Sequence, residues 1–343
     1  GLEVIRKIGK TGVVGTLKGS SKGPSIAFRA DMDALPIQET GSLEYKSIND
    51  GVMHACGHDG HMAILLAAAE VLSKYRESIS GTIKFIFQPA EEGLGGARYM
   101  IEDGALENVD QIFGLHLWNY QKIGTIGVKS GPMMAAADLF EIKIKGIGGH
   151  GASPQGTADA IVASSHLIQS LQTIVSRNIN PIESDVVTVG KINGGYNFNV
   201  ISDYVTLQGT TRAYTEEIRK LIENRMSEII NGIQTAFNVS IEFKYNKGYP
   251  PVINCEKETN ILVHAANKIV GITNVGNPYL TMGGEDFSYY LERIPGCFFF
   301  VGSSPNTKEF LKTPHHCPHF DIDEKALLIG SSIFLQIAED LLK

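Results

Sequence analysis

The first third of the chain alternates between short apolar runs and a helical stripe. Apolar or alternating residues at 25–30, 82–87 and 111–118 predict buried strands. Between the first two runs, apolar residues recur at helical spacing and predict a helix over about 59–75. Strands that alternate with helices in this way favour an α/β domain.

The middle of the chain carries a second pattern of its own. Alternating residues predict strands at 138–145, 185–192, 200–213 and 239–245. Two apolar stripes predict helices at 157–176 and after Thr215, whose hydroxyl suits a helix N-cap. The resulting order, β-α-β-β-α-β, is typical of a ferredoxin-like domain.

The last third returns to longer helices. Tyr249-Pro-Pro251 breaks the chain, and the pattern then predicts helices at 256–270, 285–291 and 322–342, with a strand at 297–301. We therefore expect an α/β fold of two domains. The catalytic, metal-binding domain is formed by residues 1–132 and 247–343, and an inserted ferredoxin-like βαββαβ domain, residues 133–246, serves as lid and dimerisation domain.

Composition narrows the class of protein. The chain has 343 residues, is 43% hydrophobic and carries a formal net charge of -7 without a basic block, so we expect no nucleic-acid partner. No apolar run approaches the roughly 20 residues that span a bilayer, so we expect no membrane partner. The four cysteines lack a disulfide-framework spacing, which favours a reducing, cytoplasmic location. Because the chain begins at Gly1 without an initiator Met, we expect a native N-terminal segment to be missing.

The densest chemistry lies in His54-Ala-Cys-Gly-His-Asp-Gly-His61. Imidazole and thiolate are the ligands that zinc and similar divalent metals prefer. A polar turn that caps a helix, with one ordinary buried cysteine, would explain a single Cys-x-His. Three histidines, one cysteine and one aspartate within eight residues favour a metal site instead.

Further donors follow the predicted strands. Asp31-Met-Asp33 and the adjacent Glu91 and Glu92 each come after a strand, where open α/β sheets place active-site groups. Alone, the two aspartates fit a solvated loop equally well, and a Glu-Glu pair is more often a solvated turn. A lone histidine such as His116 is usually a satisfied core residue. Together, one set of donors could hold two metal ions with Glu91 as a general base on metal-activated water: Cys56, His58, Glu92, His116 and one residue from the cluster at 315–319.

Five motifs, in this order along nearly the whole chain, carry a resemblance to a known family: Phe28-Arg-Ala-Asp-Met-Asp-Ala-Leu-Pro36, His54–His61, Gln88-Pro-Ala-Glu-Glu-Gly93, Gly149-His-Gly-Ala152 and Met282-Gly-Gly-Glu-Asp-Phe287. The sequence resembles the amidohydrolase branch of the aminoacylase/carboxypeptidase-G metallopeptidases. That branch includes hippurate hydrolases and indole-acetyl-amino-acid hydrolases. None of the motifs would be decisive alone, whereas their combination is specific.

The resemblance implies an enzyme with two zinc or manganese ions that cleaves small N-acyl amino acids to a carboxylic acid and a free amino acid. Carried over by motif, the ligands would be Cys56, His58, Glu92, His116 and His316. His316 is preferred because His-Cys-Pro here matches the family's His-Ser-Pro, while His315 and His319 remain rivals. Glu91 matches the general acid/base, and Asp33 matches the aspartate that orients a ligand.

Three more residues match positions in the predicted inserted domain. His150 matches a histidine that polarises the scissile carbonyl and stabilises the tetrahedral intermediate. Asn199 and Arg212 match polar positions near the substrate, and an arginine there could clamp a carboxylate. The oligomeric state that the domain arrangement suggests is a homodimer.

Two departures from the family pattern stand out. The wider clan has His-x-Asp where this chain has Asp31-Met-Asp33, so one ligand is shifted to Cys56 and the role of Asp31 is open. The helical segment with a His-Pro-Glu-Leu-type motif is absent before Gly1. If that segment is truly missing, part of the first domain and of the substrate pocket is lost with it.

Three other functions fit parts of the sequence. A metallo-exopeptidase or dipeptidase of the same clan would need an acidic partner for the substrate's free amine. A cysteine hydrolase would use Cys56 with a nearby histidine. A catalytically silent, metal-bound binding protein would need no base, so the presence of Glu91 beside Glu92 argues against it.

Overall fold

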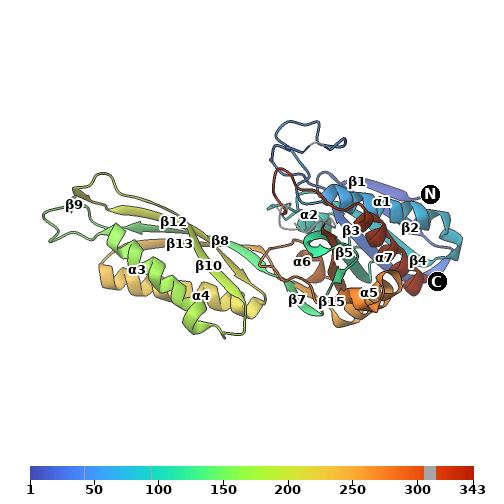
Figure 1. Ribbon diagram of the computed structural model, residues 1–343. Coiled ribbons are helices and arrows are strands. Elements are labelled where there is room, and N and C mark those ends of the chain that lie inside the picture. Colours follow the sequence, from blue (N-terminus) through green and yellow to red (C-terminus); the bar gives the residue numbers. More distant parts are fainter. Residues whose placement is uncertain (42, 94, 305–313) are drawn as a thin grey trace. The chain divides into compact units, whose positions relative to one another are not determined.

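The computed structural model describes residues 1–41, 43–93, 95–304 and 314–343, and these residues form two compact units (Figure 1). Unit 1 combines Gly1–Met133, Val252–Leu280 and Asp286–Lys343, and unit 2 combines Met134–Pro251 with Thr281–Glu285. Unit 2 is therefore inserted between parts of unit 1. It also includes residues 247–251 and the later segment Thr281–Glu285, which lie outside the expected range 133–246. No helix of the described ranges is long and apolar enough to cross a bilayer.

Unit 1 is built on a mixed eight-stranded sheet. Its strands run in the order β1 (Glu3–Ile8), β2 (Gly12–Lys18), β4 (Ser80–Gln88), β3 (Ser21–Asp31), β5 (Gln111–Lys122), β16 (Gly296–Ser304), β6 (Ile126–Gly127) and β15 (Val275–Gly276). The four central strands β4, β3, β5 and β16 are mutually parallel. Their carboxyl ends consequently meet at one edge of the sheet. A separate short pair joins β7 (Gly131–Met134) to β14 (Val252–Asn254).

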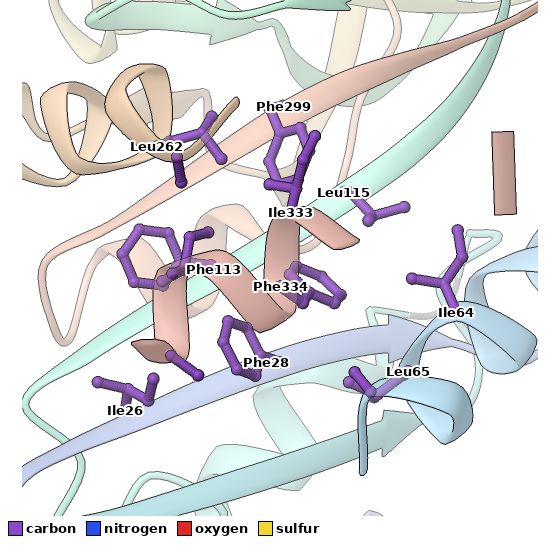
Figure 2. Packing of buried hydrophobic residues seen from close by; sticks show 14 of the residues in the cluster. Ile26, Phe28, Ile64, Leu65, Phe113, Leu115, Leu262, Phe299, Ile333 and Phe334 are labelled. Carbon is purple, nitrogen blue, oxygen red and sulfur yellow. The ribbon is translucent and has the colours of Figure 1, made fainter. Parts of the chain in front are cut away.

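Helices bury the faces of this sheet. They are α1 (His58–Lys74), α2 (Gly96–Glu102), α5 (Glu256–Val270), α6 (Ser288–Leu291) and α7 (Lys325–Leu342). Phe28 of β3 and Phe334 of α7 lie with ring centroids 4.5 Å apart, at the centre of a cluster that also takes Ile64 from α1 (Figure 2). The apolar stripes that predict α1 and α7 are the faces that lie in this core.

Unit 2 has the predicted ferredoxin-like order. Its elements are β8 (Ala136–Lys145), α3 (Ala160–Thr173), β10 (Asp185–Gly194), β12 (Tyr204–Ala213), α4 (Glu216–Phe237) and β13 (Ser240–Tyr249). The strands form an antiparallel sheet in the order β10-β12-β8-β13. Alternate side chains of β8 are buried against α3 and α4, as the strand period requires. Thr215 caps α4 by accepting a hydrogen bond from the Ile218 amide.

The structure corrects two expectations and reveals strands that were not predicted. The single strand predicted at 200–213 is wrong, because Ser202 turns its hydroxyl to the carbonyl of Tyr204 and separates β11 (Val200–Ile201) from β12. Strand β11 instead pairs with β9 (Gly149–His150). The helix predicted at 285–291 is limited to the single turn of α6. Strands β1 and β2 were not predicted.

Candidate metal centre

The carboxyl edge of the unit 1 sheet gathers the predicted donors. Asp31 is the last residue of β3, Gln88 is the last of β4, and His116 lies in the middle of β5. The segments that follow β3 and β4 carry Asp33 and the Glu91-Glu92 pair. Parallel pairing of these strands therefore brings together residues that are up to 85 positions apart in the chain.

The segment that enters α1 supplies two donors in succession. Gly57 has φ of 86°, a left-handed conformation that glycine adopts without strain, and α1 begins at the next residue. This turn places the Cys56 thiol before the helix and the His58 ring on its first residue. Both are enclosed, with Cys56 8% exposed and His58 fully buried.

Asp33 fixes the turn that carries the two glutamates. Its Oδ1 accepts the amide of Glu91 at 3.0 Å, and its Oδ2 accepts the amide of Glu92 at 2.8 Å. The turn is also closed by Gly96, where a Cβ atom would lie 1.8 Å from the carbonyl oxygen of Pro89. The same Asp33 Oδ1 lies 3.4 Å from Nδ1 of His58, so one carboxylate positions both the turn and the histidine.

His316 reaches this turn from the far end of the chain. Its backbone has a positive φ of 64°, which a histidine adopts more readily than most residues, and its amide donates to the carbonyl of Ala55 at 2.8 Å. Its Nε2 lies 3.0 Å from Oε1 of Glu92, an oxygen that has no hydrogen-bond partner among the described residues. A ring nitrogen and a carboxylate oxygen, both of the kinds that bind metal ions, thus lie next to each other.

Of the five groups of donors in the described residues that could hold a metal ion, two share Cys56. One combines Cys56, His58 and His116, and the other combines Cys56, Glu92 and His316, with ligand atoms in each group within 4.8 Å of one another. Cys56 belongs to both groups. A third group places the Glu91 carboxylate beside His58 and Glu92.

The chemistry of these donors fits divalent cations. Among the described residues, neither ring nitrogen of His58 has a hydrogen-bond partner of standard geometry, although the ring is fully buried. A coordinated metal would satisfy one nitrogen, and Asp33 lies 3.4 Å from the other, Nδ1. Burial alone would lower the pKa of His58, but neighbouring carboxylates, Asp31 foremost, outweigh it and raise the value to about 9. A buried histidine whose pKa is raised this far lies in a site of excess negative charge.

His116 presents a lone pair to the same place. Its Nδ1 donates to the carbonyl of Leu117 at 2.6 Å, so the neutral ring leaves Nε2 unprotonated, 3.5 Å from Sγ of Cys56. Burial holds the pKa of His116 well below its usual value, which keeps the ring in the neutral form that binds metals.

His61, the last residue of the dense motif, is engaged elsewhere. Its Nε2 accepts the Leu117 amide at 2.8 Å, and its Nδ1 lies 2.5 Å from Oδ1 of Asp31. Both ring nitrogens are thus used, which leaves no lone pair for a metal. Burial alone would raise the pKa of Asp31, but His58, Arg29 and His61 hold it well below its ordinary value.

A buried charge network below the donors was missed by the sequence reasoning. Arg29 donates to Asp31 at 2.6 Å and to Asp286 at 2.7 Å, and all three side chains are inaccessible to solvent. Burial raises the pKa of Asp286, and Arg29 opposes that shift. The available signal was an arginine inside the apolar run at 25–30, since a buried arginine needs a buried anionic partner.

The rival histidines differ from His316. His315 lies beside Cys56, with Nδ1 3.7 Å from Sγ, but its Nε2 accepts the amide of Asn119 at 3.1 Å. His319 is exposed, as His316 is, but unlike His316 it belongs to none of the donor groups of the described residues. The geometry therefore favours His316 among the three.

The predicted residues of unit 2 lie at two places within that unit. His150 of β9 pairs with Val200, and the carbonyl of Asn199 accepts the amide of Gly151 at 2.8 Å, so His150 and Asn199 are neighbours. Arg212 lies on β12 opposite Ala137, near the start of β8, whereas β9 follows the end of β8. Arg212 therefore lies near the start of β8, and His150 lies beyond its end.

The environment of Cys56 disfavours a cysteine nucleophile. Burial raises its pKa well above the usual value, and the carboxylates of Glu92 and Glu91 raise it further. Reactive cysteines have lowered pKa values in electropositive surroundings. A thiol in this position becomes a thiolate when cations bind to it, which suits a ligand.

Comparisons with known proteins agree with this geometry. Residues 27–340 match the family described as Peptidase family M20/M25/M40. An N-acetyl-L-cysteine deacetylase of Bacillus subtilis (strain 168) is 45% identical over 97% of this chain and 78% of its own, and the IAA-amino acid hydrolase ILR1-like 4 of Arabidopsis thaliana is 42% identical over 96% and 75%. The crystal structure of the Bacillus subtilis YXEP protein, described as a dinuclear metal binding peptidase from the M20 family, superposes with a TM-score of 0.85 at 38% identity, over 99% of this chain and 88% of that one.

These findings confirm the resemblance and the hydrolytic class predicted from the motifs. They also confirm the two-domain α/β fold, since a solved member of the family superposes on nearly the whole chain. The chain belongs to peptidase family M20/M25/M40 and, within it, to the amidohydrolase branch.

Proposed function

We propose that this protein hydrolyses the amide bond of N-acyl amino acids with two divalent metal ions, zinc or manganese. The observation that carries the proposal is the pair of donor groups that share Cys56, with the Glu91 carboxylate beside them. The predicted ligands would be Cys56, His58, Glu92, His116 and His316. When bound, two divalent ions polarise an amide carbonyl and lower the pKa of water.

The residues of unit 1 have distinct roles in this proposal. Glu91 accepts the proton of the attacking water on its carboxylate and delivers it to the leaving nitrogen. Asp33 keeps Glu91 and Glu92 in place, because its two oxygens accept both of their amides. Asp31 and His61 support the enclosed wall behind His58 rather than binding metal.

The roles proposed for unit 2 follow from the resemblance. His150 would stabilise the oxyanion of the tetrahedral intermediate, Asn199 would contact the substrate, and Arg212 would clamp its carboxylate. Arg212 and His150 lie at opposite ends of β8, and eight strand residues span about 26 Å. One copy of this unit cannot offer both ends to one small substrate, which supports a homodimer in which residues 133–246 act as lid and dimerisation domain.

A cytoplasmic location is also proposed. All four cysteines are free thiols, and Cys56 must remain reduced to act as a ligand.

The test is release of free amino acid from N-acetyl, N-benzoyl and N-indoleacetyl amino acids. The protein is reconstituted with zinc or manganese, and a chelated sample serves as control. We expect metal-dependent release from at least one of these substrates. Release from unblocked dipeptides alone would favour the exopeptidase alternative, and tight binding without product would favour the silent binding protein.

The matched variants are Glu91→Gln and Glu77→Gln. Glu91→Gln should bind metal normally and lose at least ~100-fold in turnover, because the general base is gone. Glu77 is exposed on a surface turn, so its variant should turn over like the native protein. A Glu91→Gln protein with near-normal rate would rule out the proposed base.

A further inference from the structure

His315 is adjacent to a proposed ligand but has a hydrogen-bond pattern of its own. Its Nε2 accepts the backbone amide of Asn119 at 3.1 Å, so that nitrogen carries no proton. A neutral imidazole has one N–H, which must then be on Nδ1. This Nδ1 lies 3.7 Å from Sγ of Cys56, within range of an N–H···S hydrogen bond.

Several contacts hold the His315 ring in that orientation. The ring stacks on Trp118 with centroids 4.8 Å apart and 30° between the planes, and Trp118 in turn stacks on Phe300 at 4.4 Å. The backbone amide of Asn119 fixes the tautomer of His315. Asn119 is held in place by its own side chain, which donates to the carbonyl of Asp321 at 2.7 Å. The ring is thus restrained from its face and from its edge.

Cys56 therefore lies between two histidines of opposite character. His116 turns an unprotonated Nε2 toward Sγ at 3.5 Å, whereas His315 turns an N–H toward it. His116 can bind the same metal ion as the sulfur, and His315 can donate a hydrogen bond to the sulfur. The same sulfur belongs to both donor groups.

We propose that His315 is a positioning residue that donates an Nδ1–H hydrogen bond to the Cys56 thiolate and so sets how the thiolate binds the two metal ions. This inference rests on the proposed metal centre. A hydrogen bond to a coordinated thiolate withdraws electron density from the sulfur, and partners of metal ligands orient them. His315 would thus fix the direction of the sulfur and weaken its donation, which leaves the metals more acidic.

Two substitutions separate the donor from the packing. His315→Asn places an amide N–H near the position of Nδ1, and His315→Gln places one near the position of Nε2. Both lose the ring that stacks on Trp118, so the loss of stacking cancels when the two are compared. Only the asparagine variant retains a donor directed at Cys56.

The readout is the absorption spectrum of the protein loaded with cobalt(II), whose thiolate charge-transfer band reports on the sulfur directly. We expect this band to move to lower energy in His315→Gln and to stay near its native position in His315→Asn. Affinity for zinc, measured by competition with a chelator, should fall by ~10–100-fold in His315→Gln, because the lost orientation of the sulfur outweighs its stronger donation, and much less in His315→Asn. If the glutamine variant does not fold, His315→Phe, which keeps a ring on Trp118 without a donor, replaces it.

Either of two outcomes would overturn the inference. The band could be unchanged in all folded variants, which would mean that His315 does not bond to the thiolate. The asparagine and glutamine variants could also shift equally, which would assign the effect to packing alone. A native protein without any charge-transfer band would instead refute Cys56 as a ligand, and the proposed metal centre with it.

Discussion

Asp286 offers a direct test of the buried network under the metal centre. Its carboxylate accepts Arg29 at 2.7 Å, Gln88 at 2.9 and 2.7 Å and the amide of Ala97 at 2.9 Å, and the residue is fully buried. Asp286→Asn removes the charge while keeping the shape and one oxygen. Arg29, itself 0% exposed, would then lose one carboxylate partner and keep that of Asp31.

The expected loss is large. Truncation of one partner of a buried ion pair costs ~3–5 kcal/mol, and because asparagine keeps one acceptor we expect about 3 kcal/mol in the free energy of unfolding. With a denaturant slope of ~3 kcal/mol per M of urea, the midpoint should fall by about 1 M. That loss is a substantial share of the ~5–15 kcal/mol that stabilises a typical domain.

The protein's one tryptophan makes the assay specific to unit 1. Trp118 is buried in β5, so its fluorescence follows the unfolding of the unit that contains Asp286. Asp50→Asn, at an exposed loop position, is the matched control and should stay within ~0.5 kcal/mol of the native protein. A loss below about 1 kcal/mol for Asp286→Asn would refute its role as the charged partner of Arg29.

Two further predictions concern metal and a helix cap. Chelation should abolish amide hydrolysis and lower the urea midpoint of the Trp118 transition, because metal at 100 times its dissociation constant contributes ~2.7 kcal/mol to the folded state; a midpoint that does not respond to chelation and metal return would contradict metal binding in unit 1. Thr215→Ala should destabilise unit 2 by about 1 kcal/mol in calorimetry, because its hydroxyl accepts the Ile218 amide at 3.3 Å, while Thr235→Ala, exposed within the same helix, should cost nothing. Equal effects of the two threonine substitutions would argue against the cap.

Helices were predicted from sequence more accurately than strands. The apolar stripe at 256–270 coincides with α5, and the stripe at 59–75 differs from α1 by one residue at each end. A one-sided stripe repeats over several turns, so its ends are well marked. Strand β1 carries no such mark, because its residues are exposed or half-buried and Lys7 interrupts the pairing with a positive φ of 67°.

The donor set could be predicted as residue types but not as individual roles. His61 and His116 both come from segments rich in apolar residues. Only the tertiary contacts reveal that Asp31 and Leu117 bond to both ring nitrogens of His61, whereas His116 turns its unprotonated Nε2 toward Cys56. His315 and His316 are adjacent in sequence, yet the Asn119 amide engages only His315. Such choices depend on backbone groups from other strands, which no local pattern encodes.

The pairing of β5 with β16 has a consequence for biosynthesis. The two strands are neighbours in the sheet, but 173 residues separate the end of β5 at Lys122 from the start of β16 at Gly296, and unit 2 is translated in between. At ~5–20 residues per second, the ribosome needs roughly 10 to 35 s to supply that partner strand. During this interval β5 has an unpaired edge and side chains that are buried only in the finished sheet, such as Phe113 and Leu115. This edge of unit 1 is thus open to aggregation while unit 2 is being translated, and protection of the nascent chain is needed until the last third of the protein has emerged.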